Sequence, residues 1–123
     1  MRTQRAAAIW IVAAMFVATA APVAFGHTEV RSTSPASGAT AKTTITSASV
    51  TFTGEVKSGT LRVTGPGGKV VSIGAGGRDP RNPKRLLAGL KGSLKAGSYT
   101  ASWKIAARDG HSQHGSFRFT LRR

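Results

Sequence analysis

Alternating apolar and polar residues characterise most of the chain from Ser47 onward. Ala48, Val50 and Phe52 alternate with serines and threonines, and two segments near the C-terminus repeat this pattern over greater lengths. Because side chains two positions apart lie on the same face of a strand, each segment predicts a strand with one buried face. The apolar positions of the two later strands are Tyr99, Ala101, Trp103, Ile105 and Ala107 in the first, and Phe117, Phe119 and Leu121 in the second.

Turn-forming residues divide the middle of the chain into further short segments. Leu61 and Val63 continue the alternation, and Gly65-Pro66-Gly67-Gly68 predicts the turn that follows them. Short strands at intervals of about ten residues, without a helical period, predict an all-β antiparallel β-sandwich. The segments expected beyond the turn are a short strand at 70–73, a Gly/Pro-rich loop at 74–83, and a short strand within 86–94 followed by a turn at 95–97.

The first residues have the order of a secretory signal peptide. Arg2 and Arg5 provide a positive start, and an uncharged apolar stretch of about 16 residues follows, from Ala6 to Ala21, before Pro22. The alternative is a membrane anchor that stays on the protein. The stretch is shorter than the roughly 20 residues that span a bilayer, so we expect a cleaved signal peptide instead.

The expected cleavage position follows from small residues at the end of this segment. Ala24-Phe25-Gly26 is a small-x-small site, whereas Ala18-Thr19-Ala20 and Ala24 are alternative ends. Removal of residues 1–26 leaves residues 27–123, which are 97 residues and suffice for one small domain with a single core. We therefore expect one exported domain, in the periplasm or on the exterior of the cell envelope, that begins with His27.

The composition of this domain excludes several kinds of chemistry. The chain has no cysteine, and both methionines, Met1 and Met15, lie in the segment expected to be removed. The domain therefore has no disulfide and no soft sulfur ligand for Cu(I). Without Arg2 and Arg5 it keeps 16 basic and 4 acidic side chains, which gives a net charge of +12.

The positive charge is scattered along the whole domain. It does not indicate nucleic acid as a partner, because an exported protein rarely meets any and no aromatic residues interleave with the basic ones. A solvated basic surface suited to an anionic cell envelope is the simpler interpretation. The densest cluster, at residues 78–85, is expected to form a loop that is either solvated or in contact with anionic lipid or a partner.

Three residues near the two ends of the domain carry candidate metal-binding groups. An N-terminal histidine offers its α-amine and its imidazole together, so cleavage before His27 creates a chelating residue. Near the C-terminus, Asp109-Gly110-His111 supplies a carboxylate and a second imidazole. In extended backbone Asp109 and His111 would lie on the same side of a strand, whereas an Asp-Gly turn is the alternative for this segment.

Together these groups form an N3O donor set. Cu(II) favours nitrogen and oxygen donors in tetragonal geometry, and Zn(II) in a tetrahedral site is the alternative. Because the amine, the imidazoles and the carboxylate bind in their deprotonated forms, we expect the affinity for metal to fall in acid.

The same residues belong to a wider set of motifs. These are Ser34-Pro35-Ala36 with Gly38, Val50-Thr51-Phe52, Leu94-x-x-Gly97-x-Tyr99-x-x-x-Trp103, and Asp109-Gly110-His111 followed by Gly115-Ser116-Phe117-x-Phe119. With His27 at its start, the sequence resembles the CopC family of exported copper-resistance proteins over the whole expected domain. The resemblance implies a Greek-key β-sandwich, Ig-like or cupredoxin-like, that holds one Cu(II) per chain through His27, Asp109 and His111. It also implies a role beside a CopD-type membrane copper transporter.

The sequence departs from the family at several positions. Some relatives have a methionine-rich Cu(I) site, which this domain cannot build. Many have an acidic residue two places after the phenylalanine that corresponds to Phe52, whereas Glu55 comes one place later, on the other side of a regular strand. His114 is an additional histidine, either exposed or an axial or neighbouring group of the metal site.

Two further residues have expected structural roles. Trp103 is expected to anchor the core, with packing beneath the metal as the alternative. Glu29 is expected to be a solvated charge on an edge strand.

These patterns together predict a monomeric extracytoplasmic protein that binds Cu(II) for sequestration, resistance or delivery to a transporter, without catalytic turnover. The sequence offers no recognisable nucleophile–base pair. One alternative is an oxidative enzyme with a histidine-brace copper site, although Asp109 would then fill an equatorial position. The other is a β-sandwich interaction module whose histidines bind no metal.

Overall fold

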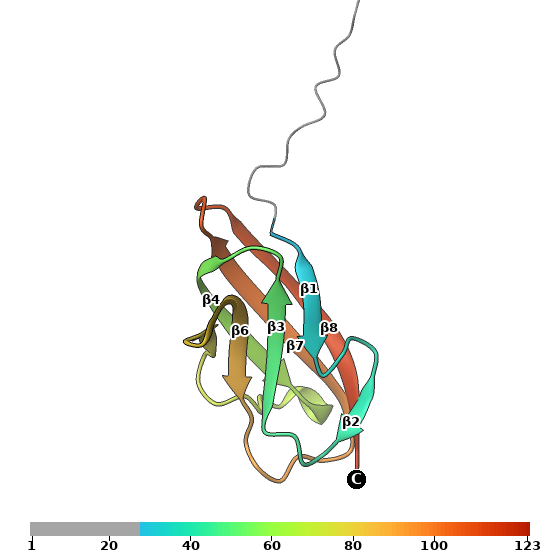
Figure 1. Cartoon of the computed structure of the whole chain (residues 1–123). Helices are drawn as coiled ribbons and strands as arrows, with labels where there is room; N and C mark the ends of the chain where they lie inside the picture. Colours follow the sequence, from blue (N-terminus) through green and yellow to red (C-terminus); the bar gives the residue numbers. More distant parts are fainter. Residues whose placement is uncertain (1–27) are drawn as a thin grey trace, which may run out of the picture.

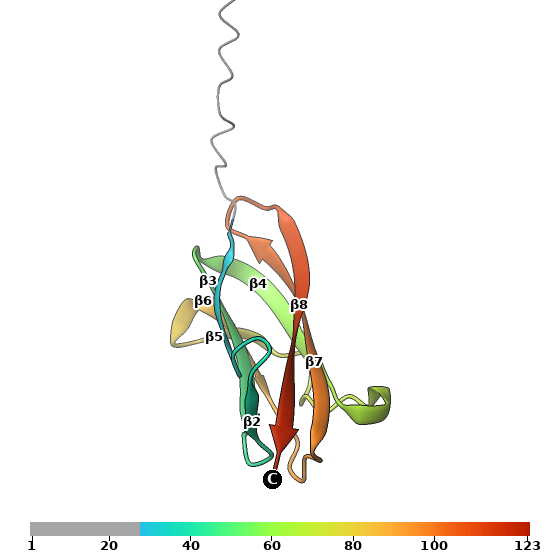
Figure 2. The ribbon, with the colours of Figure 1, turned by 90° about the vertical axis from the view of Figure 1, so that its right-hand side faces the viewer.

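The computed structural model describes residues 28–123, which form two β-sheets packed face to face (Figures 1 and 2). Among these residues the one helical segment is a short 3-10 turn, η1 (Pro66–Gly68). The described part of the chain contains no helix that is long and apolar enough to cross a bilayer. The strands are β1 (Val30–Ser34), β2 (Thr40–Lys42), β3 (Ser47–Phe52), β4 (Val56–Thr64), β5 (Gly77–Asp79), β6 (Asn82–Gly89), β7 (Gly97–Ala107) and β8 (Ser112–Arg122).

Each sheet contains four strands. The first has the order β1-β3-β6-β5 and the second the order β2-β8-β7-β4, so the chain crosses repeatedly from one sheet to the other. All pairs are antiparallel except β2 with β8, which are parallel. The predicted all-β sandwich is confirmed, with one parallel pair that the sequence did not indicate.

The core lies between the sheets and is built from the predicted alternating positions. Trp103 meets Phe52 edge to face at a centroid distance of 4.9 Å, and Tyr99 stacks on Phe119 at 5.6 Å. Such contacts add to the free energy gained by removing aromatic surface from water. The buried aromatic and aliphatic side chains include Val50, Phe52, Leu61, Val63, Leu86, Tyr99, Trp103, Ile105, Phe117, Phe119 and Leu121.

Residues 70–73 do not form the predicted strand. Val70 and Ser72 make only isolated bridges, because the segment changes partners along its length. The amide of Val71 donates to the carbonyl of Val63 on β4, while the amide of Ile73 donates to the carbonyl of Gly89 on β6. The segment therefore crosses between the two sheets instead of extending either one.

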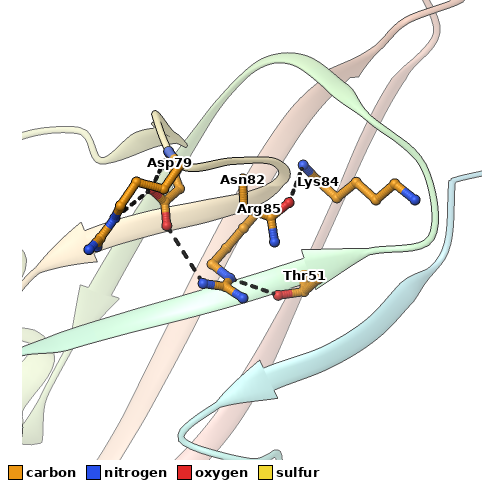
Figure 3. Close-up of polar contacts among 6 residues, drawn as sticks. Thr51, Asp79, Asn82, Lys84 and Arg85 are labelled. Atoms are coloured by element: carbon orange, nitrogen blue, oxygen red, sulfur yellow. Dashed lines mark hydrogen bonds and ion pairs between the residues drawn. The ribbon is translucent and has the colours of Figure 1, made fainter.

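The predicted loop at 74–83 is also partly wrong, because it contains β5 and the start of β6. These strands form a tight hairpin whose turn is held by Asp79 (Figure 3). The Asp79 carboxylate is buried, accepts a hydrogen bond from the amide of Arg81 at 2.9 Å, and lies 3.7 Å from the guanidinium of Arg85. Arg85 in turn donates to the hydroxyl of Thr51 on β3 at 3.1 Å. Part of the basic cluster at 78–85 is thus bound to a buried carboxylate within the sheet.

Candidate metal centre

The loop between β7 and β8 carries the predicted carboxylate and imidazole. β7 ends at Ala107 and β8 begins at Ser112, so Asp109 and His111 lie in a hairpin turn and not in extended backbone. The amide of Gly110 donates to the carbonyl of Ala107, and the amide of Ala107 donates to the carbonyl of His111, both at 2.9 Å. Gly110 has φ +90°, a conformation that favours glycine. The turn alternative is correct, and the extended geometry expected for this segment is wrong.

The turn nevertheless brings the two side chains together. One carboxylate oxygen of Asp109 accepts the backbone amide of His111 at 3.0 Å, and the other lies 2.8 Å from His111 Nδ1. An aspartate that accepts the amide two residues later is a common stabiliser of such turns. The turn at residues 108–111 therefore places a carboxylate oxygen of Asp109 and a ring nitrogen of His111 next to each other.

The contact between the two side chains changes their acidity. The hydrogen bond from His111 lowers the pKa of the Asp109 carboxyl, and the same bond together with the carboxylate charge raises the pKa of His111. The imidazole is 78% exposed and the carboxylate 29%. Both groups are therefore accessible to an ion from solvent, and a proton competes for the imidazole at a higher pH than for an isolated histidine.

The beginning of the described chain lies at the same end of the sandwich. The amide of Glu29 donates to the Thr53 hydroxyl at 3.0 Å, and the amide of Thr53 donates to the carbonyl of Glu29 at 2.8 Å. Thr28 is buried, and its hydroxyl would be 3.0 Å from a Cβ placed on Gly54. The first described residues, Thr28 and Glu29, are thereby held against the turn between β3 and β4.

That turn is connected in the structure to the β7–β8 loop. Glu55, which follows Gly54, forms an ion pair with Arg108, the residue before Asp109. Figures 1 and 2 both show the start of β1, the β3–β4 connection and the β7–β8 loop gathered at one end of the molecule. Arg108 did not stand out in the sequence because an arginine beside a turn has no distinctive pattern, and only the register of β4 with β7 brings it to Glu55.

The remaining candidates occupy separate positions. His114 is exposed on β8, in register with Lys104 on β7, and is not grouped with Asp109 and His111. Glu55 is paired with Arg108, and Glu29 is exposed beside β1. Trp103 is buried in the core, directly across from Gly115, so the prediction of a core anchor is confirmed.

Within residues 28–123, no three histidine, cysteine, aspartate or glutamate side chains converge in the manner of a complete metal site. Asp109 and His111 supply two donors, and a metal bound there needs further donors. His27, which is predicted to supply these donors, lies immediately before Thr28 and outside the described residues.

Comparison with known proteins identifies the family. Residues 30–122 match the model of the CopC domain. The chain belongs to the CopC family. This membership gives it a copper-related function, in a family of exported copper-resistance proteins that are not known as enzymes.

The individual relatives with which the chain aligns are distant in sequence. Protein YobA from Escherichia coli strain K12 is 26% identical over 103 residues, which cover 82% of this chain and 83% of YobA. The match to protein YobA from Shigella flexneri has the same identity and coverage.

Solved structures share the fold. The crystal structure of CopC from Methylosinus trichosporium OB3b aligns with a TM-score of 0.64 and 23% identity, covering 77% of this chain and 93% of that one. PcoC from Escherichia coli, described as a methionine-rich copper-resistance protein, aligns with a TM-score of 0.65 and 21% identity, covering 78% and 99%. The CopC-like sandwich is therefore retained here by a domain whose residues 27–123 contain no methionine.

Proposed function

We propose that the exported protein begins at His27 and binds one Cu(II) per chain through His27, Asp109 and His111. Bound copper is held in the periplasm or outside the cell for sequestration, resistance or delivery to a CopD-type membrane transporter. The observation that carries the proposal is the Asp109–His111 pair in the β7–β8 loop, at the end of the sandwich where the described chain starts. CopC family membership supports copper as the ion.

The donor chemistry also favours Cu(II). The α-amine and imidazole of an N-terminal histidine form a chelate, and the loop adds a second imidazole and a carboxylate. Nitrogen and oxygen donors of this kind suit Cu(II), which binds more tightly than Zn(II) at equal availability. Residues 27–123 contain no sulfur, so the domain is proposed to hold copper in the oxidised state and not to shuttle Cu(I).

The pairing of His111 with Asp109 suits this role in the absence of metal. The Asp109 carboxylate holds the His111 ring in place near the turn before copper binds. Copper binding therefore does not have to restrict the motion of a free imidazole. Binding requires that His111 lose its proton, and Asp109 then serves as an oxygen donor or as the group that orients the ring. No catalytic turnover is proposed.

The first experiment compares two forms of copper-free protein. One is secreted protein whose mass confirms a start at His27, and the other carries one extra residue before His27. Cu(II) affinity is measured by competition titration, and coordination by electron paramagnetic resonance (EPR). We expect tight one-to-one binding with a tetragonal, nitrogen-rich spectrum for the first form, and loss of that spectrum for the second.

Two substitutions define the loop donors. His111→Ala is expected to weaken binding by at least tenfold, because it removes an imidazole ligand. His114→Ala removes an exposed histidine three residues later on β8 and is the matched control, with affinity expected to be unchanged. Equal and weak binding by the His27-start form, the extended form and both variants would leave the chain as a sandwich without a specific copper site.

A further inference from the structure

The outer face of the β2-β8-β7-β4 sheet carries an unusual set of side chains. Alternate residues of β4, β7 and β8 point to the core, and those between them lie on the opposite, exposed face. Most exposed positions hold serine, threonine or a cation. The cations of this face are Lys42, Arg62, Lys104, Arg118 and Arg122, with His114 among them, and we refer to the set as the outer cationic face.

The acidic side chains of the protein lie elsewhere. Asp79 is bound by Arg81 and Arg85, Glu55 by Arg108, and Asp109 by His111. The fourth acid, Glu29, precedes β1 of the other sheet. Among the described residues, no ion pair involves a cation of the outer cationic face. The five lysine and arginine side chains of this face thus lie together on one sheet surface, and no carboxylate forms an ion pair with any of them.

The strand register places several of these groups close together. His114 lies directly across from Lys104, which lies across from Thr60, and Arg62 lies two residues further along β4. Adjacent strands are about 4.8 Å apart and two residues advance about 6.8 Å, so the backbones of Arg62 and Lys104 are about 8 Å apart. They line a hollow of about 680 Å³ together with His114 and the hydroxyl side chains of Ser102 and Ser116.

Clustered cations and hydroxyl groups suit phosphate oxygens, which accept charge-assisted hydrogen bonds. The described aromatic side chains are buried in the core, and Trp103, which borders the hollow, is only 8% exposed, so this face lacks the exposed aromatic surface on which bases of single-stranded nucleic acid stack. The outer cationic face is as wide as a four-stranded sheet. A face of this width suits an extended negatively charged surface better than a single small anion. The leaflet of a membrane with anionic phospholipids is such a surface.

We propose that the outer cationic face docks the exported protein on anionic phospholipid headgroups. This binding is separate from the proposed copper site, which lies in the β7–β8 loop, and does not require copper. It keeps the domain beside the membrane. Each lysine or arginine near an anionic bilayer contributes about a fivefold increase in partition, so loss of two such cations lowers partition roughly 25-fold.

The test measures co-sedimentation of copper-free, secreted protein with phosphatidylglycerol/phosphatidylcholine vesicles and with pure phosphatidylcholine vesicles. We expect binding to the first and not to the second, weakening as salt is raised because ions screen the attraction. The face variant is Arg62→Gln with Lys104→Gln, which should reduce partition roughly 25-fold.

The matched control is Arg31→Gln with Lys84→Gln. Both residues are exposed and belong to the β1-β3-β6-β5 sheet, and their replacement removes the same charge from the molecule. Partition that stays within a few-fold of the unmodified protein in this control, beside the large loss in the face variant, supports the proposal. An equal loss in both variants, binding to phosphatidylcholine alone, or no binding to anionic vesicles would overturn it.

Discussion

The contact between Asp109 and His111 is the residue-scale feature on which the proposed copper site depends. Their 2.8 Å contact joins two groups that are accessible to solvent, so it contributes little to the stability of the fold. Its main effect is on the protonation and orientation of the His111 imidazole. The raised pKa of His111 means that the contact stabilises the folded state in acid. This stabilisation is complete between the pKa of an unfolded aspartate and that of an unfolded histidine. It disappears as the pH rises through the raised folded pKa of His111, and also as the pH falls through the lowered folded pKa of Asp109.

Asp109→Asn tests this coupling at a single residue. Asparagine keeps an oxygen that accepts the amide of His111, so the turn is preserved, but it removes the negative charge that holds the imidazolium. We expect the pKa of His111 to fall toward its ordinary value, as measured by an NMR pH titration of the metal-free protein. An unchanged His111 pKa would show that the carboxylate does not control this proton.

At the scale of elements, strands with a clear apolar alternation were predictable and the others were not. β3, β7 and β8 bury every second residue, and the sequence identified them. β1 and β2 are mostly exposed and have no apolar period, so no pattern in the sequence predicted their positions. β5 lies in a Gly/Pro-rich segment, and its pairing depends on the tertiary position of the Asp79 carboxylate, which no local pattern reveals.

The same limits apply to the candidate site. The chemistry of Asp109 and His111 was predictable from residue type and spacing, and the structure brings them together. Their geometry was not, because Asp-Gly is compatible with both a strand and a turn, and the register of β7 with β8 decides between them. Strand parity predicted that Glu55 lies on the other side of a regular strand, but its ion pair with Arg108, the residue before Asp109, follows only from the fold.

Asp79→Ala tests whether a buried carboxylate maintains the β5–β6 hairpin. The substitution leaves the amide of Arg81 without its acceptor and opens a polar space beside β6, so we expect a loss of about 1–3 kcal/mol in the free energy of unfolding, measured by urea denaturation. The ion pairs contribute little of this, because the guanidinium groups of Arg81 and Arg85 are partly or largely exposed.

Asn82→Ala is the control for this hairpin. It removes a similar side-chain bond, from the amide of Lys84 to Asn82 Oδ1 at 3.0 Å, but in an exposed setting where water replaces it. We expect a change within about 0.5 kcal/mol. Equal losses for Asp79→Ala and Asn82→Ala would mean that burial of the Asp79 carboxylate is not what stabilises the hairpin.

At the scale of the whole molecule, the two proposed functions use different surfaces. The proposed donors Asp109 and His111 belong to the β7–β8 loop, at the end of the sandwich where β1 starts, and the outer cationic face covers one broad side. A domain held on a membrane by its side leaves its end open to receive copper. The sandwich itself separates the two, because β7 and β8 carry the loop at their ends and the cationic side chains on their outer face, while their inner face packs in the core.

Copper at the proposed site would also connect the two sheets, since His27 precedes β1 of one sheet and Asp109 and His111 follow β7 of the other. Because copper then binds the folded chain and not the unfolded one, at a free concentration 100 times the Kd it should add about 2.7 kcal/mol to the free energy of unfolding. Thermal denaturation with and without Cu(II) measures this gain. We expect it in the His27-start protein and in His114→Ala, and its loss in His111→Ala and in the form with an extra N-terminal residue. A gain of the same size in all four would indicate copper bound at other surface groups, and the connection between β1 and the β7–β8 loop would then have no part in copper binding.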